Sequence, residues 1–155
     1  MQNLRLGIIG LGNMGQAHAD SISRERVSRC RLTAVCDPDQ QLLKRYVQAR
    51  PFLLSSELIK SGEVDAVLVA TPHYSHTTIG IEALEAGLHL LVEKPLCVHK
   101  ADCERLIAAH RSKKQVFATM FNQRTDPYFL KLREFIQNGE LGTIRRINWI
   151  ITNWF

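Results

Sequence analysis

The chain has 155 residues, of which 45% are hydrophobic, and it carries a formal net charge of +5. This length suffices for one full domain with its own core and not for two. No apolar run approaches the roughly 20 residues of a transmembrane helix, and the sequence passes from Met1 directly into a strand pattern, without room for a signal peptide. We therefore expect a cytoplasmic protein with no membrane partner.

The basic residues gather at the ends of expected elements and do not follow one face. Arginines cluster over residues 24–31, and basic pairs stand at 113–114 and 145–146. A nucleic-acid-binding protein favours a continuous basic face with interleaved aromatic side chains, so we expect no nucleic-acid partner. The four cysteines show no CxxC pair and no metal-ligand spacing with histidine, which predicts reduced thiols and no metal site.

The first part of the chain carries an ordered set of signals. A strand pattern over Leu4–Gly10 leads into Gly10-x-Gly12-x-x-Gly15, and a helix is expected from Met14 to about Arg24. A second strand over 31–37 then ends in an acid, Asp37. A strand, a glycine triplet, a helix, a second strand and a terminal acid, in this order and spacing, form the dinucleotide-binding fingerprint.

The middle of the chain continues the alternation of strands and helices. Pro38 is expected to start a helix that runs through Val47, followed by a short strand near Phe52–Leu54 and a short helix that ends at 61–62. Three further strands are expected over 65–71, 89–92 and 115–120, with helices over 76–85 and 101–112. This alternation predicts an α/β fold of the Rossmann type, with a doubly wound, six-stranded parallel sheet.

The end of the chain changes in character. A helix is expected over 128–136, and a long β-type run follows over 144–155. The six-stranded sheet is complete before this run, so we infer that it begins a second sheet that the chain does not contain. We expect an NAD(P)-binding domain over 1–122, and over 123–155 the first helix and strand of a truncated second α/β domain for substrate binding and oligomerisation.

Each glycine of the triplet has an expected role. Gly10 permits the tight turn, Gly12 lets the backbone approach a pyrophosphate, and Gly15 lets the helix pack close to the strand. The phosphates would then lie on the free N–H groups of the helix N-terminus. The residues between the glycines complete the expected cofactor loop: Leu11, Asn13 and Met14. The alternative is a glycine-rich turn that binds no ligand.

Asp37 is expected to select the cofactor. Its carboxylate would accept hydrogen bonds from the adenosine ribose hydroxyls and repel a 2′-phosphate. No arginine follows at once, because the next residues are Pro38, Asp39 and Gln40. The pattern therefore favours NAD over NADP. An acidic helix cap beside Pro38 is the alternative role for this position.

Two further motifs follow strands at the same edge of the predicted sheet, where ligands gather in open α/β folds. The first is the segment 71–76, in which Thr71, Pro72, His73 and His76 are candidates for cofactor or substrate contacts. His76 could instead bond backbone at the start of its helix. The other histidines have no partnered motif and are expected to be structural or exposed: His18, His89, His99 and His110.

The second motif is Glu93-Lys94-Pro95, at the end of the fifth strand. An ammonium group at this edge can bond a substrate hydroxyl and stabilise the alkoxide character that develops during hydride transfer. The alternative is that Lys94 is simply an exposed side chain without a functional role, as most lysines at strand ends are. The position of Lys94 beside the expected cofactor edge favours a functional role.

Together these motifs resemble the Gfo/Idh/MocA family of oxidoreductases, named after glucose–fructose oxidoreductase and inositol dehydrogenase. The resemblance covers nearly the whole chain and rests on the following residues: the loop 10–15 with His18, Asp37, Thr71-Pro72 with His76, the segment 83–87, Glu93-Lys94-Pro95, and Leu141-Gly142-x-Ile144. The Glu-Lys-Pro motif after a Thr-Pro-x-x-x-His segment is specific to this family, whereas the glycine triplet alone is not.

The resemblance implies an N-terminal NAD(P)-binding domain, a C-terminal α/β domain, and oxidation or reduction of sugars, inositols or related polyols, with homo-oligomers in the complete protein. It makes Lys94 the catalytic lysine, and it places the glycine loop, Asp37, Thr71, Pro72 and Glu93 at the cofactor. It also places Arg124, just after the sixth strand, near the nicotinamide. Two departures stand out. His73 replaces an asparagine of many members, and the family's acid/base histidine and aspartate would lie beyond Phe155.

Two hypotheses of different classes follow. The first is the cofactor-binding part of a sugar, inositol or polyol dehydrogenase, unable to turn over alone because its proton acceptor is missing. The second is a free-standing, non-catalytic NAD-binding or sensing module. A self-sufficient module should not end in an apolar run with an open edge, so the run over 144–155 favours the first hypothesis and predicts self-association of the isolated chain.

Overall fold

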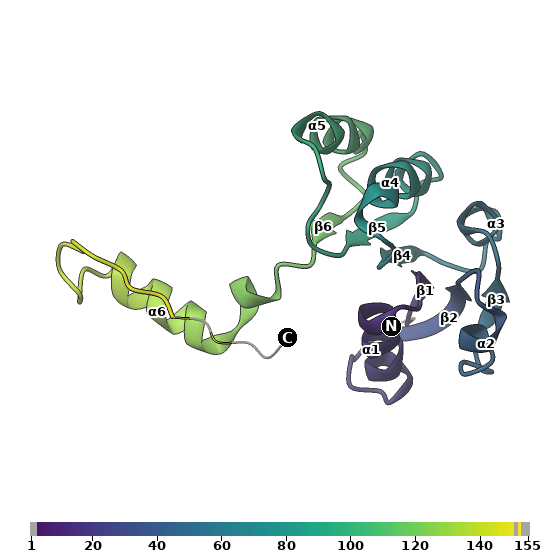
Figure 1. Ribbon diagram of the computed structural model, residues 1–155, viewed down its shortest axis with the longest axis horizontal. Helices are drawn as coiled ribbons and strands as arrows, with labels where there is room; N and C mark the ends of the chain where they lie inside the picture. The colour runs from purple at the N-terminus through teal and green to yellow at the C-terminus, as the bar shows by residue number, and fades with distance from the viewer. Residues whose placement is uncertain (1–2, 151, 153–155) are drawn as a thin grey trace. The chain divides into compact units, whose positions relative to one another are not determined.

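Six parallel strands form one sheet in the order β3-β2-β1-β4-β5-β6 (Figure 1). The computed structural model describes residues 3–150 and 152 of the chain. The strands are β1 (Leu4–Ile9), β2 (Cys30–Cys36), β3 (Arg50–Phe52), β4 (Ala66–Val69), β5 (His89–Val92) and β6 (Phe117–Thr119). The strand order reverses between β1 and β4, and in open α/β sheets this is the point where ligands bind. The predicted Rossmann fold is confirmed.

Helices connect these strands and cover both faces of the sheet. They are α1 (Asn13–Ser23), α2 (Gln40–Leu43), α3 (Ser55–Lys60), α4 (His76–Glu85) and α5 (Lys100–Ala109), with a short 3-10 helix η1 (His73–Ser75) before α4. In Figure 1, α1 and α2 lie on one side of the strands and α4 and α5 on the other. No helix in the described residues combines the length and the apolar character that crossing a bilayer requires.

The alternation of side chains along the strands divides the core into two parts. Val67 and Val69 of β4 pack into the cluster that contains residues of α3, α4 and α5. Ala66 and Leu68 of the same strand pack into the cluster with residues of α1 and α2. All four residues are buried, which explains why this strand reads as a continuous apolar run.

The helix expected from Pro38 through Val47 is much shorter in the structure, and this prediction was wrong. The helix α2 begins at Gln40, because the Asp39 side chain accepts a hydrogen bond from the Gln41 N–H with 2.8 Å between Oδ1 and N. It ends at Leu43, one helical turn before Val47. The Val47 side chain is 91% exposed while Leu43 is buried, so Val47 does not continue the buried face of the helix.

Several other boundaries shift by a few residues. The expected strand near Phe52–Leu54 is β3, two residues earlier, and the expected strand over 115–120 is reduced to Phe117–Thr119. The expected helix over 101–112 ends at Ala109. The four cysteines are free.

The chain divides into two compact units, Met1–Met120 and Phe121–Phe155. The second contains a 3-10 helix η2 (Asn122–Thr125) and the helix α6 (Pro127–Gln137). Asp126 caps α6, since its Oδ1 accepts a hydrogen bond from the Tyr128 N–H at 2.9 Å. The helix predicted over 128–136 is therefore confirmed.

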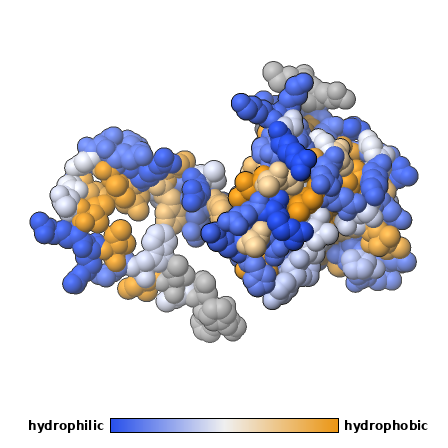
Figure 2. Space-filling model, turned by 90° about the horizontal axis from the view of Figure 1, so that it is seen from above, coloured by the Kyte–Doolittle hydropathy of each residue, from blue (hydrophilic) through white to orange (hydrophobic). Residues whose placement is uncertain are grey.

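The β-type run that follows α6 forms no strand over the described residues 144–150. A strand requires a hydrogen-bonding neighbour, and the second unit offers none among these residues. Trp149 instead stacks on Phe129 of α6, with 5.3 Å between ring centroids. The rest of the predicted strand, including Ile151 and the segment 153–155, lies mostly outside the described residues. Figure 2 shows hydrophobic side chains exposed on this unit. The exposed large hydrophobic residues of the unit include Ile147 and Ile150.

Candidate functional site

The glycine loop between β1 and α1 is shaped by close backbone contacts. Gly10 has a φ of +93°, and a Cβ there would lie 2.8 Å from the Ala70 carbonyl carbon. A Cβ at Gly15 would lie 1.8 Å from the Gly10 carbonyl oxygen. No side chain fits at either position, so both glycines are required by the turn itself.

Gly12 differs from its neighbours because a Cβ at this position would meet no atom within 4 Å. The residue also precedes α1 at its N-cap and supplies no side-chain oxygen to the first turn. The N–H groups of this turn thus remain available beside an open space. A helix N-terminus with free amides and no bulk in front of it suits a phosphate group, so these residues fit the pyrophosphate of a dinucleotide.

The Asp37 carboxylate lies beside this loop and follows the end of β2. Its Oδ2 accepts a hydrogen bond from the Leu11 N–H at 2.7 Å, and its Oδ1 accepts one from the Asp39 N–H at 2.9 Å. A carboxylate oxygen can accept more than one hydrogen bond. Because Asp37 is partly exposed, it retains acceptor capacity toward a ribose.

The residues predicted from the separate motifs meet at one cleft of about 730 Å³. The cleft lies at the carboxyl ends of the strands, at the switch point. Ten of the predicted site residues line it: Gly10, Gly12, Asn13, Met14, Asp37, Thr71, Pro72, His73, Glu93 and Lys94. Further lining residues that the motifs did not include are mostly apolar, and Ile79 and the segment 53–55 are among them. Such side chains are suited to a flat aromatic ring.

Leu11, Gly15 and His76 do not line this cleft. Leu11 is fully buried in the core and contributes only its backbone N–H to Asp37. His76 is also fully buried. Its Nε2 lies 2.9 Å from the Thr71 carbonyl oxygen and its Nδ1 lies 3.0 Å from the Pro95 carbonyl oxygen. The structure thus gives His76 the alternative role: it ties two loops of the site together and presents no surface to a ligand.

His18, expected to be structural or exposed, has a structural partner that the sequence did not indicate. Its Nε2 lies 2.6 Å from Oε1 of Glu93, which is 5% exposed. The two residues are 75 positions apart, and no local spacing indicates that the fold brings them together. His110 and His89 have structural hydrogen bonds to backbone groups, as expected.

Arg124 lies in the second unit, within η2. Its guanidinium carbon lies 5.6 Å from the centre of the Phe121 ring. Its expected position near the nicotinamide stays a prediction.

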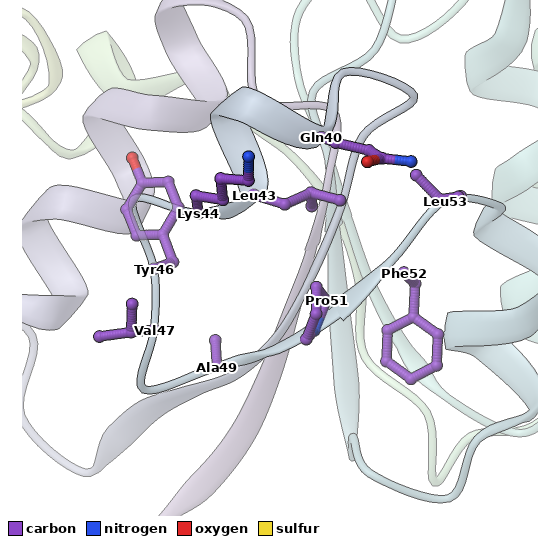
Figure 3. A pocket seen from close by; sticks show the side chains of 9 residues that line it. All are labelled: Gln40, Leu43, Lys44, Tyr46, Val47, Ala49, Pro51, Phe52 and Leu53. Carbon is purple, nitrogen blue, oxygen red and sulfur yellow. The ribbon is translucent and has the colours of Figure 1, made fainter.

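Other cavities of the first unit lack this combination of groups. One of about 460 Å³ lies between α2 and β3 and is lined mostly by apolar side chains (Figure 3), with Leu43, Tyr46 and Pro51 among them. Among the described residues no carboxylate lines it, and the helix N-terminus at its lining is that of the four-residue α2, at Gln40. Within the described ranges, no cluster of three or more histidine, cysteine or acidic side chains is arranged to hold a metal ion.

Comparisons with known proteins identify relatives of this chain. The Gfo/Idh/MocA family model, described as an oxidoreductase family with an NAD-binding Rossmann fold, matches residues 4–121. A myo-inositol 2-dehydrogenase of Thermotoga maritima is 32% identical over 143 residues, which cover 90% of this chain and 42% of that protein.

Solved structures show the same relationship. The crystal structure of myo-inositol 2-dehydrogenase from Lactobacillus plantarum has a TM-score of 0.85 at 27% identity. The match covers 92% of this chain and 43% of that enzyme's chain. A second crystal structure is that of scyllo-inositol dehydrogenase from Lactobacillus casei, with bound NAD(H) and scyllo-inositol. It has a TM-score of 0.83 at 25% identity, and the match covers 91% of this chain and 43% of that enzyme's chain. This chain therefore spans less than half the length of these relatives.

Proposed function

Because this chain belongs to the Gfo/Idh/MocA family of oxidoreductases, we propose that it is the cofactor-binding part of an NAD-dependent dehydrogenase for a sugar, an inositol or a related polyol. The observation that carries the proposal is the single cleft at the switch point, where the phosphate loop, Asp37 and Lys94 meet. These are the groups that hold a dinucleotide at one end and polarise a substrate hydroxyl at the other.

The cofactor is proposed to be NAD in preference to NADP. The Leu11 and Asp39 amides hold the Asp37 carboxylate beside the glycine loop, where the adenosine ribose of a dinucleotide lies when its pyrophosphate occupies the helix N-terminus. A 2′-phosphate would meet this fixed negative charge. Among the described residues that line the cleft, the one lysine or arginine is Lys94, which follows β5, whereas Asp37 follows β2.

Lys94 is proposed as the catalytic residue. Its side chain is exposed at the end of β5 and lines the cleft. When bound, the nicotinamide accepts or donates the hydride. The Lys94 ammonium group would donate a hydrogen bond to the reacting oxygen and stabilise its alkoxide character in the transition state. A base must also take the hydroxyl proton, and in this proposal the base belongs to residues outside the sequence of this chain.

The substrate class comes from the relatives. Myo-inositol and scyllo-inositol dehydrogenases are among the proteins that this chain resembles, and a vicinal polyol suits a hydrogen-bonding lysine. In this account residues 1–122 are the cofactor domain and 123–155 begin a substrate domain, with Arg124 near the nicotinamide. We propose a cytoplasmic protein that forms homo-oligomers when complete.

The test compares kcat and NADH affinity between the unsubstituted protein and its variants, each as the full-length native protein. Lys94→Ala is expected to lower kcat about 100-fold or more, the usual cost of removing a transition-state donor, while the affinity for NADH changes little. Lys100→Ala is the matched control, because its side chain is 89% exposed and, within the described part of the chain, pairs with Glu104 one turn away. An NADH affinity that falls as much as kcat would make Lys94 a binding residue.

A free-standing, non-catalytic NAD-binding module is the second candidate. One observation favours it: all residues that line the cleft lie between Ile9 and Lys94, within a single compact unit. The intact mass of the protein from its source separates the two candidates. A mass near 17.6 kDa supports the module, and a mass about twice that or more supports the dehydrogenase.

A further inference from the structure

Glu93 is a buried carboxylate with both oxygens engaged. The residue is 5% exposed. Its Oε1 lies 2.6 Å from His18 Nε2, and its Oε2 accepts a hydrogen bond from the Lys94 backbone N–H at 3.0 Å. A carboxylate removed from water is costly unless it is paired, so the orientation of this group depends on the partners it has.

His18 supplies the partner from a different element. It lies on α1, the helix whose N-terminus forms the phosphate loop, whereas Glu93 directly follows β5. Glu93 lines the cofactor cleft, and His18 lines a separate cavity of about 1100 Å³ on the α1 side of the sheet. The pair therefore connects the phosphate-binding helix to the strand end that carries Lys94.

We propose that His18 is a positioning residue for Lys94 and acts through Glu93. The imidazole fixes the carboxylate, and the carboxylate fixes the Lys94 backbone by accepting its N–H. A defined backbone at this residue limits the directions in which its side chain can extend toward the cleft. The inference rests on the role proposed above for Lys94, but the contacts themselves can be tested in this chain without a substrate.

The chain of contacts has a direct readout in the Lys94 amide. Hydrogen exchange of this amide reports whether the carboxylate accepts from it. His18→Phe removes the donor while keeping a ring of similar size, and leaves the buried Glu93 without its side-chain partner. We expect the Lys94 amide to exchange about tenfold faster or more, the cost of one hydrogen bond to a charged group. The Leu90 amide of β5, which donates to the Val116 carbonyl oxygen, is expected to keep its rate.

His18→Gln is the rescue variant, because its amide N–H reaches about as far as the imidazole Nε2 and can donate to the same oxygen. Its Lys94 amide is expected to exchange within about threefold of the unsubstituted rate. His110→Phe is the matched control: His110 Nε2 lies 2.9 Å from the Gln115 carbonyl oxygen, so its loss removes a histidine contact that does not involve Glu93 or Lys94. It should leave the Lys94 amide unchanged.

If His18→Phe does not fold, the double variant with Glu93→Gln removes the unpaired charge and allows the same measurement alongside His18→Gln. Equal exchange rates of the Lys94 amide in the unsubstituted chain and in His18→Phe, or in the double variant that replaces it, would overturn the proposal. Equal acceleration at Lys94 and Leu90 would also overturn it, since His18 would then only stabilise the fold. NADH titration of the same samples tests the proposed function separately, because the exchange rates decide the role of His18 whether or not NADH binds.

Discussion

The Asp37 carboxylate accepts a hydrogen bond from the Leu11 amide, 26 residues earlier in the chain, with 2.7 Å between Oδ2 and N. This contact joins the end of β2 to the phosphate loop. It holds the negative charge at a fixed distance from the loop, so a cofactor whose phosphates occupy the loop presents its ribose to a carboxylate that does not move away. In the proposed function, selectivity for NAD would therefore depend on a backbone contact as well as on the charge.

Asp37→Ala is expected to reduce the preference for NADH over NADPH by about tenfold, or 1.4 kcal/mol. The substitution removes both the acceptor for the ribose hydroxyls and the charge that repels a 2′-phosphate. Fluorescence titrations with the two cofactors measure the ratio. Asp39→Ala is the control, because it removes the same charge two residues away, where the side chain caps α2. Equal affinities for NADH and NADPH in the unsubstituted chain would remove the basis for choosing NAD.

Two alanine substitutions in the phosphate loop are expected to act differently. Gly12→Ala places a methyl group where no atom lies within 4 Å, so the chain should keep its thermal stability while NADH binds about tenfold more weakly or worse. Gly15→Ala places a Cβ 1.8 Å from the Gly10 carbonyl oxygen and should destabilise the fold by about 3 kcal/mol or more. Thermal unfolding and NADH titration of both variants check this. A destabilised Gly12→Ala chain would contradict the open space in front of α1.

The fold and most of the cleft were predictable because their signals are local. The glycine triplet, the acid after β2 and the motifs after β4 and β5 each stand at a strand end, and parallel strands bring those ends to one edge. The long helices α4 and α6 were also predictable, since each has an apolar face with a stop signal: Gly87 and Gly139 both have positive φ.

The features that the sequence did not predict depend on contacts between residues that are distant in the chain. The partner of His18 is set by how α1 packs against the sheet, and the burial of His76 follows from the path of the loop that contains Pro95. The early end of α2 is accompanied by the exposure of Val47, whose side chain is 91% exposed. None of these has a sequence spacing that a helix or strand period would reveal.

Tyr46 predicts how stability changes in alkali. Burial, together with the hydrogen bond from its hydroxyl to Asp20, raises the pKa of Tyr46 from 10.0 to about 12. Because the folded-state pKa lies above the unfolded one, the neutral phenol stabilises the fold fully below pH 10, and this contribution is lost as the pH rises from about 10 to 12. Tyr46→Phe should therefore lose less stability over that interval than the unsubstituted chain.

At pH 7, the loss of the hydrogen bond to Asp20 should cost Tyr46→Phe about 1 kcal/mol. Urea unfolding at a series of pH values measures both effects, and Tyr74→Phe serves as the control because Tyr74 is 80% exposed. Parallel stability curves for the Tyr46→Phe and unsubstituted chains above pH 10 would contradict the assignment.

The exposed apolar side chains after α6 predict self-association. Ile147 is 71% exposed and Ile150 is 88% exposed, and apolar surface of this kind favours contacts between chains. Light scattering should give a mass above 17.6 kDa that increases with concentration. The double variant Ile147→Lys and Ile150→Lys should have a lower mass at the same concentration. Val47→Lys should not lower the mass, because Val47 lies in the first unit, although its side chain is 91% exposed. A stable monomer at high concentration would contradict this prediction.

The central claim is that the cleft at the switch point binds NAD, and the most direct test is an NMR titration of the chain with NADH. The account predicts saturable shifts of the amides at Asn13, Gly15 and Asp37, with one NADH per chain. It would be contradicted if no amide reached saturation, or if the shifts were confined to the apolar cavity between α2 and β3 (Figure 3).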